Sequence, residues 1–177
     1  VVYAGGLNAE RDMELLITAF NRVYRERGVR LLLFGHGESS YVKNIMARVQ
    51  GGSVIYGGNI PYDQVNSFLD LSLIGVVTYQ KNPLTVRALP TKVFEYARLE
   101  KTMVLPRLGE LERVFADSAY FYEVGNADDL TEKLILALDN RGKFTDKALE
   151  RVKPYEWDIM QKRLLALYKE LREELDL

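Results

Sequence analysis

Short apolar runs alternate with helix-like patterns along this chain of 177 residues, and this alternation constrains the fold more than any other feature. Between the runs, apolar residues recur at spacings of three and four, which is typical of amphipathic helices. The apolar runs themselves predict six strands, at Val1–Ala4, Arg30–Phe34, Ser53–Tyr56, Leu73–Val77, Thr102–Leu105 and Ala119–Tyr122. Strands that alternate with helices indicate βαβ units with right-handed crossovers. We therefore predict an α/β fold, a doubly wound (Rossmann-like) six-stranded parallel sheet with helices on both faces.

The carboxyl-terminal segment predicts one long helix, which runs from about Glu156 to Leu175 after a break at Pro154. Its apolar residues recur at helical spacing, and its other positions are heavily charged. Two interpretations stay open with equal weight. The helix packs on this domain, or it crosses to a partner domain.

Composition excludes several classes of function. Hydrophobic residues make up 47% of the chain and charged residues 28%, as in ordinary globular proteins. The formal net charge of -1 gives no support to a nucleic-acid-binding surface. The chain has no cysteine, which excludes disulfides and cysteine metal sites. It also shows no signal peptide and no apolar run of the ~20 residues that a bilayer requires.

The predicted first strand begins at the first residue, and chains seldom begin inside a core strand. We therefore expect residues 1–177 to form a single domain that is the carboxyl-terminal half of a longer protein, with an amino-terminal domain missing.

The stretch Leu89–Tyr96 predicts an anion site at the start of a helix. Pro90 suits the first helical position, because its missing N–H would be unpaired there anyway. The free amides of the first turn and the helix dipole then attract an anion, and Thr91 and Lys92 add a hydroxyl donor and a positive charge. Glu95 lies on the same face one turn further along, and a carboxylate suits ribose hydroxyls. The alternative is an ordinary amphipathic helix with solvated charges.

Glycine turns follow the first three predicted strands, and the carboxyl ends of parallel strands are where such sheets bind ligands. Gly5 and Gly6, followed by Arg11, can form a phosphate loop, or only a tight turn with a surface arginine. Gly35 and Gly57 stand in the corresponding turns after the second and third strands.

Other polar residues give no catalytic or metal site. His36 lies between two glycines, where it fits a turn better than a catalytic base. Asp128 and Asp129 fit the first turn of a helix better than a paired acidic site. No metal site is predicted.

Several of these segments, in this order, resemble the carboxyl-terminal domain of the retaining GT-B glycosyltransferases, the group that includes glycogen synthase and many mannosyl- and glucosyltransferases. The segment Val2–Phe20 is similar to that group's Gly-Arg-Leu…Lys-Gly…Leu-Leu…Ala-Phe pattern, and Leu31–Glu38 is similar to its strand followed by Gly-x-Gly-x-Glu. Pro90-Thr91-Lys92-x-x-Glu95-Tyr96 resembles its Pro-x-Lys-x-x-Glu-Tyr helix. Tyr155–Asp158 and the long helix resemble its terminal segment.

The resemblance implies a site for a nucleoside diphosphate sugar. It implies that Arg11 and Lys92 stabilise the diphosphate as catalytic residues, and that Glu95 binds the ribose. Gly5, Gly6, Gly35, Gly57, Pro90 and Thr91 complete the nucleotide-binding set. Two positions depart from the family pattern. Gly6 stands where the family has an arginine, and Arg87 replaces the glutamate that contacts the donor sugar.

We therefore expect the donor-binding domain of a retaining glycosyltransferase that moves a hexosyl group, such as mannosyl or glucosyl, from a UDP- or GDP-sugar. A saccharide or lipid-linked acceptor would be held by the missing domain, and this domain alone would be inactive. The resemblance implies no metal or other cofactor. We expect a cytoplasmic protein, which a lipid-linked acceptor would place at the inner membrane surface. Two alternatives are a non-catalytic nucleotide-binding module of the same fold and a nucleotide-sugar epimerase.

Overall fold

All six predicted strands are present in the computed structural model, which describes residues 1–174. They are β1 (Val2–Ala4), β2 (Leu31–Phe34), β3 (Val54–Gly58), β4 (Gly75–Val76), β5 (Met103–Pro106) and β6 (Tyr120–Tyr122). Every pairing between them is parallel, as predicted. The strands are short, and five of them consist mainly of buried or half-buried residues, whereas Ile55 and Tyr56 of β3 are exposed.

The prediction of one continuous six-stranded sheet is wrong. The strands form two three-stranded sheets, in the orders β1-β2-β3 and β4-β5-β6. Strands β1 and β4 lie beside each other at the boundary between the sheets, without forming a ladder. This boundary could not be predicted from the sequence, because each apolar run is compatible with one continuous sheet and with two separate sheets.

Hydrogen bonds around β4 explain the boundary. The amide of Gly75 donates to Thr102, just before β5, and that of Val77 donates to Val104 in β5, so the N–H and C=O of Val76 between them face towards β1. There the carbonyl oxygen of Val76 accepts the hydroxyl of Tyr96 at 3.3 Å instead of an amide of β1. Beyond β4 the chain bonds to the loop after β1, since Thr78 Oγ1 donates to the carbonyl oxygen of Arg11 at 2.6 Å. Side-chain and loop contacts therefore join the two sheets.

Residues 1–174 also form eight α-helices and three short 3-10 helices, of which α6, α7, η3 and α8 follow the last strand. The α-helices are α1 (Met13–Arg27), α2 (Ser39–Met46), α3 (Tyr62–Asp70), α4 (Thr91–Arg98), α5 (Gly109–Phe115), α6 (Ala127–Asp139), α7 (Thr145–Val152) and α8 (Trp157–Glu174). The 3-10 helices are η1 (Ala9–Arg11), η2 (Thr85–Arg87) and η3 (Lys153–Tyr155). Sequence analysis did not predict α5. It also placed Pro90 inside α4, whereas Pro90 is the N-cap with an extended ψ of 144°.

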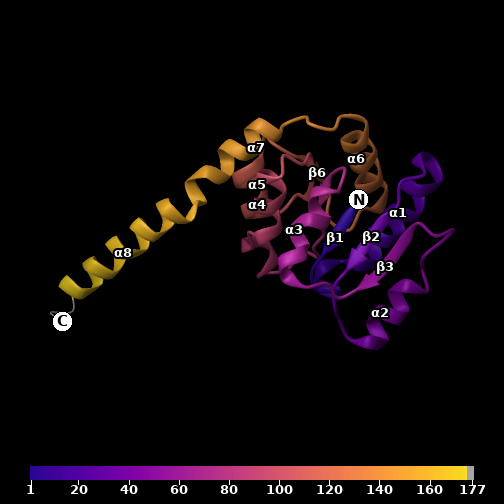
Figure 1. Ribbon diagram of the computed structural model, residues 1–177, viewed down its shortest axis with the longest axis horizontal. Coiled ribbons are helices and arrows are strands. Elements are labelled where there is room, and N and C mark those ends of the chain that lie inside the picture. Colours follow the sequence, from indigo (N-terminus) through magenta and orange to yellow (C-terminus); the bar gives the residue numbers. More distant parts are fainter. Residues whose placement is uncertain (175–177) are drawn as a thin grey trace.

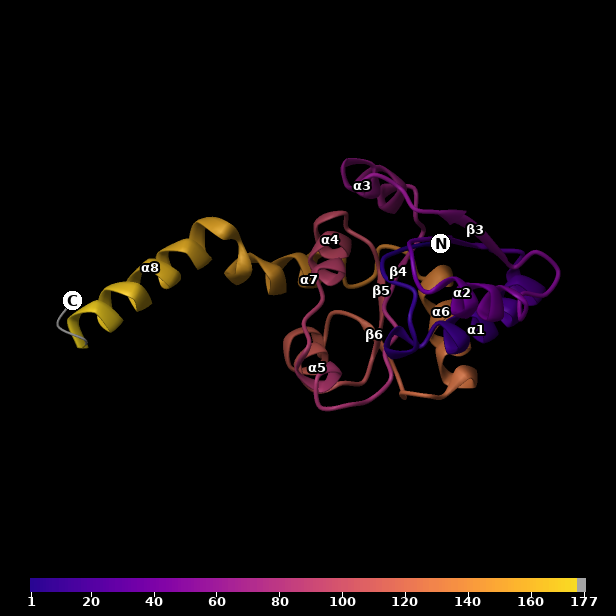
Figure 2. The same ribbon diagram turned by 90° about the horizontal axis from the view of Figure 1, so that it is seen from below.

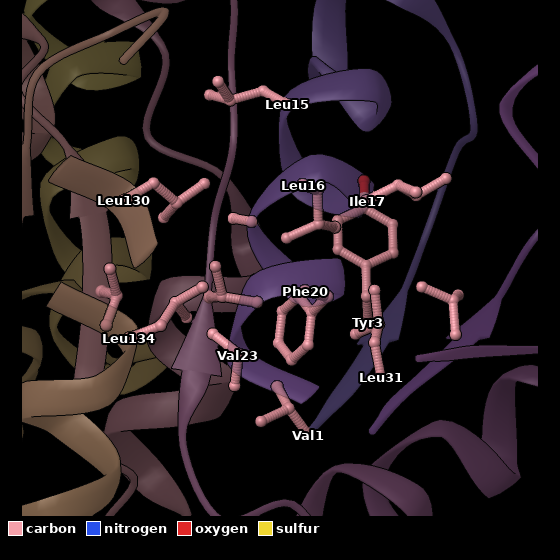
Figure 3. Packing of buried hydrophobic residues seen from close by; sticks show 14 of the residues in the cluster. Val1, Tyr3, Leu15, Leu16, Ile17, Phe20, Val23, Leu31, Leu130 and Leu134 are labelled. Atoms are coloured by element: carbon pink, nitrogen blue, oxygen red, sulfur yellow. The ribbon is translucent and has the colours of Figure 1, made fainter. Parts of the chain in front are cut away.

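Two groups of helices cover the two faces of the sheets. Helices α1, α2 and α6 pack on one face, and Figure 3 shows Leu16, Phe20 and Val23 of α1 between the strands and Leu134 of α6. Helices α3, α4, α5 and α7 carry the second cluster of buried side chains. Figures 1 and 2 show these groups on different sides of the strands. This two-sided covering confirms the predicted doubly wound layering.

Helix α8 extends away from the body of the protein (Figures 1 and 2). None of its residues is buried, and Trp157 and Leu165 are 67% and 66% exposed. The interpretation in which α8 packs on this domain is therefore wrong for the described residues, and the predicted helix end at Leu175 lies outside them. Within residues 1–174, no helix combines the length and apolar character that a membrane span needs.

Candidate functional site

A cavity of about 750 Å³ lies where β1 and β2 end, where the chain leaves β3, and where α4 begins. Its volume falls within the range of ordinary small-molecule sites. Parallel strands bring these loops together, because their carboxyl ends meet at the same edge. The cavity is lined by Ala4, Gly5, Arg11, Phe34, Gly35, His36, Asn59, Ile60, Pro61, Tyr62, Val65, Tyr79, Leu89, Pro90, Thr91, Lys92 and Glu95.

Lys92 is the most deeply buried charged residue of this site, with 7% of its surface exposed. Its Nζ lies 3.4 Å from the centroid of the Tyr3 ring, on β1. Burial and, to a smaller extent, the nearby charge of Arg11 lower the pKa of Lys92, Glu95 opposes both, and the net pKa is about 7. An anion in the cavity would favour the charged form of Lys92.

Arg11 provides the second cation, from the end of η1. Its Nη1 donates to the hydroxyl of Tyr79 at 2.7 Å, and its guanidinium carbon lies 5.0 Å from the centroid of the same ring. The carbonyl oxygen of Arg11 is held by Thr78, so both the backbone and the side chain are fixed by the segment after β4. Burial raises the pKa of Tyr79, and Arg11 opposes this. Tyr79 therefore stays neutral at physiological pH.

Two glycines allow the backbone to pass close to these cations. A Cβ added to Gly5 would lie 2.6 Å from Lys92 Nζ, which is closer than real side chains approach. A Cβ added to Gly35 would overlap the carbonyl oxygen of Gly5, and Gly35 has a φ of +141° that side chains rarely adopt. The loops after β1 and β2 can therefore meet only because position 35 is glycine, and Gly5 leaves the space in which Lys92 Nζ lies.

The start of α4 faces the same cavity. Pro90, Thr91 and Lys92 line it, so the first-turn amides of α4 and its dipole face the site of the two cations. Glu95, one turn along, also lines the cavity and is half-buried. Burial raises the pKa of Glu95, while Lys92 opposes the rise. This end of the cavity therefore suits a ligand whose anionic part lies next to a part that carries hydroxyl groups.

The other end of the cavity is apolar. It is lined by Phe34 of β2, by Ile60 and Pro61 between β3 and α3, and by Val65 of α3. Phe34 is held by Phe68, whose ring centroid lies 4.7 Å away. Because the strand order is β3-β2-β1 with β4 beyond, these loops lie to one side of the cations. The cavity therefore suits a ligand with one charged part and one flat or apolar part.

The structure brings most of the predicted site residues together. Seven of them line the cavity: Gly5, Gly35, Arg11, Pro90, Thr91, Lys92 and Glu95. Three do not. Gly6 and Gly57 do not line the cavity. A Cβ at Gly57 would overlap the ring of Phe34, so the absence of a side chain at Gly57 makes room for this ring. Arg87 lies on η2 with its side chain exposed, also outside the lining.

Sequence analysis missed the two tyrosines that contact the cations. Tyr79 was included in an irregular loop, although its place just beyond the fourth strand was a signal for the ligand-binding edge. Tyr3 was treated only as part of a core strand. His36 lines the cavity, exposed, and keeps no assigned role. Asp128 and Asp129 stand in the first turn of α6, where their amides donate to Asn126, as the capping interpretation predicted.

The parallel α/β fold thus places a cationic cavity at the carboxyl edge of its strands, and the charges of this cavity suit an anionic small molecule. Residues 1–140 match the family described as "Glycosyl transferases group 1", and the chain therefore belongs to that family. No curated protein matches the chain.

Solved structures with similar folds support this assignment. A glycosyltransferase from Rickettsia africae ESF-5 aligns with a TM-score of 0.81 and 15% identity, over 96% of this chain and 46% of that one. S. aureus TarM, solved with fondaparinux, alpha-GlcNAc-glycerol and UDP, aligns with a TM-score of 0.74 and 18% identity, over 92% of this chain and 34% of that one. The chain thus spans less than half the length of these two proteins.

A third structure is closer in length. The catalytic domain of cholesterol-alpha-glucosyltransferase from Helicobacter pylori aligns with a TM-score of 0.72 and 19% identity, over 88% of this chain and 97% of that one. At these identities the likeness concerns the fold alone. Family and fold together support the predicted GT-B type of glycosyltransferase domain.

Proposed function

We propose that this chain is the donor-binding domain of a retaining glycosyltransferase, and that its cavity binds a nucleoside diphosphate sugar. The observation that carries the proposal is the meeting of Lys92, Arg11 and the start of α4 in one cavity, in a member of the glycosyl transferases group 1 family. The diphosphate would lie against these positive groups, the ribose beside Glu95, and the base towards Phe34 and Ile60.

The proposed chemistry is stabilisation of the leaving group. When the bond between the sugar and the diphosphate breaks, negative charge grows on the diphosphate oxygens. Lys92, Arg11 and the first-turn amides of α4 are already in place to stabilise this charge. These positive groups can take the part that a metal ion has in other enzymes, so we propose a reaction that needs no metal or other cofactor.

The acceptor would be held by a further domain. Two facts support this part of the proposal: the chain spans 46% and 34% of the two longer glycosyltransferases, and α8 exposes apolar residues along its length. A hexosyl group, mannosyl or glucosyl, remains our proposal for the transferred sugar, and a UDP- or GDP-sugar for the donor. The acceptor would be a saccharide or a lipid-linked molecule, and the latter would place this cytoplasmic enzyme at the inner membrane surface. Without its partner domain, residues 1–177 would be inactive.

Arg87 favours a second candidate function, that of a non-catalytic nucleotide-binding module. It replaces the family's glutamate, and in this structure it lies outside the cavity lining. A module of that kind would bind nucleotide without turnover in the full-length protein. An epimerase would act on the nucleotide sugar with no acceptor present.

Calorimetric titration tests the donor site directly. UDP, GDP and ADP are titrated into this chain and into Glu95→Ala, with Arg27→Ala as a control far from the cavity. We expect saturable binding of one diphosphate, weakened by Glu95→Ala and unchanged by Arg27→Ala. If none of the three binds, either to this chain or to the full-length protein, the donor-site proposal is wrong.

A further inference from the structure

Lys92 lies over an aromatic ring and forms no ion pair with a carboxylate within residues 1–174, where the ion pairs of the structure involve other basic residues. The distance of 3.4 Å from Nζ to the centroid of the Tyr3 ring is a close cation–π contact. Lys92 follows β4 in the chain, and Tyr3 is on β1. The contact therefore forms at the boundary between the two three-stranded sheets.

The Tyr3 ring is held rigidly. It is 1% exposed, and Figure 3 shows it between α1 and the neighbouring strand, close to Ile17 and Leu31. Its hydroxyl donates to the carbonyl oxygen of Gly6 at 3.1 Å, which fixes the ring and the glycine turn together. Gly5 leaves room for the amine, since an added Cβ at this position would lie 2.6 Å from Nζ. The amine therefore lies between the ring face of Tyr3 and the backbone of the glycine turn.

We propose that Tyr3 is a positioning residue, whose ring face keeps Lys92 charged and directed at the diphosphate. This inference rests on the proposed function, because it specifies how the site prepares for that ligand. Three groups face the amine. Arg11 on η1 repels it, Glu95 on α4 attracts it, and Tyr3 on β1 is neutral, because burial raises the pKa of its phenol far above physiological pH.

A ring face has an advantage over a carboxylate in this position. A carboxylate would cancel the lysine's charge and would repel the incoming phosphates. A ring attracts the cation through its quadrupole and carries no net charge, so the full positive charge remains available. Since burial lowers the pKa of Lys92 to about 7, the amine is only partly charged at neutral pH without ligand. The contact with Tyr3 then decides how much of the protein is ready to bind.

The test varies the electron density of the ring and leaves its size nearly constant. Tyr3→Phe is made first, and ring-fluorinated phenylalanines are then introduced at the same position in the full chain. Carbon-13 NMR of labelled lysine follows the titration of Lys92, whose signal is identified by its loss in Lys92→Met. We expect the midpoint to fall stepwise with fluorination, by about one pH unit in total, the scale of a desolvated cation–π contact.

Inorganic pyrophosphate provides the binding readout. Its affinity at pH 8 should fall by roughly tenfold across the fluorinated series, but by less than about twofold at pH 6, where about half or more of Lys92 is charged in every variant. Tyr122 on β6 is the matched control. It is as buried as Tyr3, but the cation–π contacts of Lys92 and Arg11 are with Tyr3 and Tyr79. The same fluorinated residues at position 122 should leave the Lys92 midpoint unchanged.

The outcomes separate the two proposals. A midpoint that stays constant along the series, while pyrophosphate still binds the unsubstituted protein, overturns the role of Tyr3 alone. A midpoint that falls as expected, in a protein that binds neither pyrophosphate nor any nucleoside diphosphate, overturns the donor site and with it the purpose assigned to the contact. A midpoint that falls equally for substitutions at Tyr122 shows a general loss of packing and also overturns the role of Tyr3.

Discussion

The two ends of α1 place an arginine in opposite electrostatic surroundings. Arg27, the last residue of the helix, pairs with Asp139 of α6 at 3.1 Å, and this hydrogen bond raises the pKa of Arg27. A cation at this end is also favoured by the helix dipole. Arg11 lies just before the other end, where the dipole disfavours a cation, and its side chain contacts the neutral Tyr79.

The difference distinguishes a charge that stabilises the fold, that of Arg27, from charges that are placed to bind a ligand, those of Arg11 and Lys92. Arg27 is where stability alone would place it. Arg11 precedes the first residue of α1 by two positions, Lys92 is in the first turn of α4, and both contact tyrosine rings at the same cavity. An arrangement that is unfavourable in the empty protein becomes favourable when an anion arrives, which is the usual conflict between stability and activity at functional sites.

The largest effect is expected from Lys92. In the full-length enzyme, Lys92→Ala should lower the rate of sugar transfer by roughly 10²-fold or more, because the charge that stabilises the leaving diphosphate is lost. Initial rates with donor and acceptor measure this, and Arg27→Ala is the control. A near-normal rate for Lys92→Ala would show that this lysine has no part in the chemistry.

The same lysine should make the empty protein less stable. Its pKa falls from 10.5 in the unfolded chain to about 7 in the folded one, so between these values the unfolded chain binds more protons. The free energy of unfolding should therefore rise with pH from about 7 to 10, relative to Lys92→Met, by about 1 kcal/mol or more. Urea unfolding of both proteins at several pH values gives the difference, in which other titrating groups cancel. A constant difference would mean that Lys92 keeps its ordinary pKa when folded.

This comparison also shows what sequence can and cannot predict. The strands were predicted from their apolar runs, and Gly5, Lys92 and Glu95 were placed together because the carboxyl ends of parallel strands meet at one edge. The boundary between the sheets and the contact of Lys92 with Tyr3 were not predicted. Both depend on side chains far apart in the sequence, and no local pattern records which ring a buried amine will meet.

Helix α5 was also not predicted, but for a different reason. Its buried residues Leu111, Val114 and Phe115 have helical spacing, so the signal was present in the sequence. By contrast, the exposed position of Arg87 follows from how η2 packs, which the sequence pattern does not specify.

A smaller effect is expected from Tyr79→Phe, which keeps the ring beside Arg11 and removes the 2.7 Å hydrogen bond. The guanidinium would then be less well ordered, and the affinity for pyrophosphate should fall by roughly threefold to tenfold, the scale of one such bond. Arg30 and Tyr24 form a matched pair on the surface, with a 3.1 Å hydrogen bond and 5.3 Å between the guanidinium carbon and the ring centroid. Tyr24→Phe should leave the affinity unchanged. Equal losses in both variants would show that the tyrosine hydroxyl has no specific role at the cavity.

The smallest effect should come from Arg27→Met, and it tests whether the cavity's attraction for anions is local. Arg27 lies at the far end of the 15-residue helix α1, roughly 20 Å from its first residue at 1.5 Å per residue. That distance is about twice the screening length at physiological salt, and Asp139 already compensates the charge. The affinity for pyrophosphate at physiological salt should therefore change by less than about twofold. A larger loss, growing as salt is lowered, would show that the field of the whole protein attracts the ligand, and the contrast between the two ends of α1 would then not explain binding.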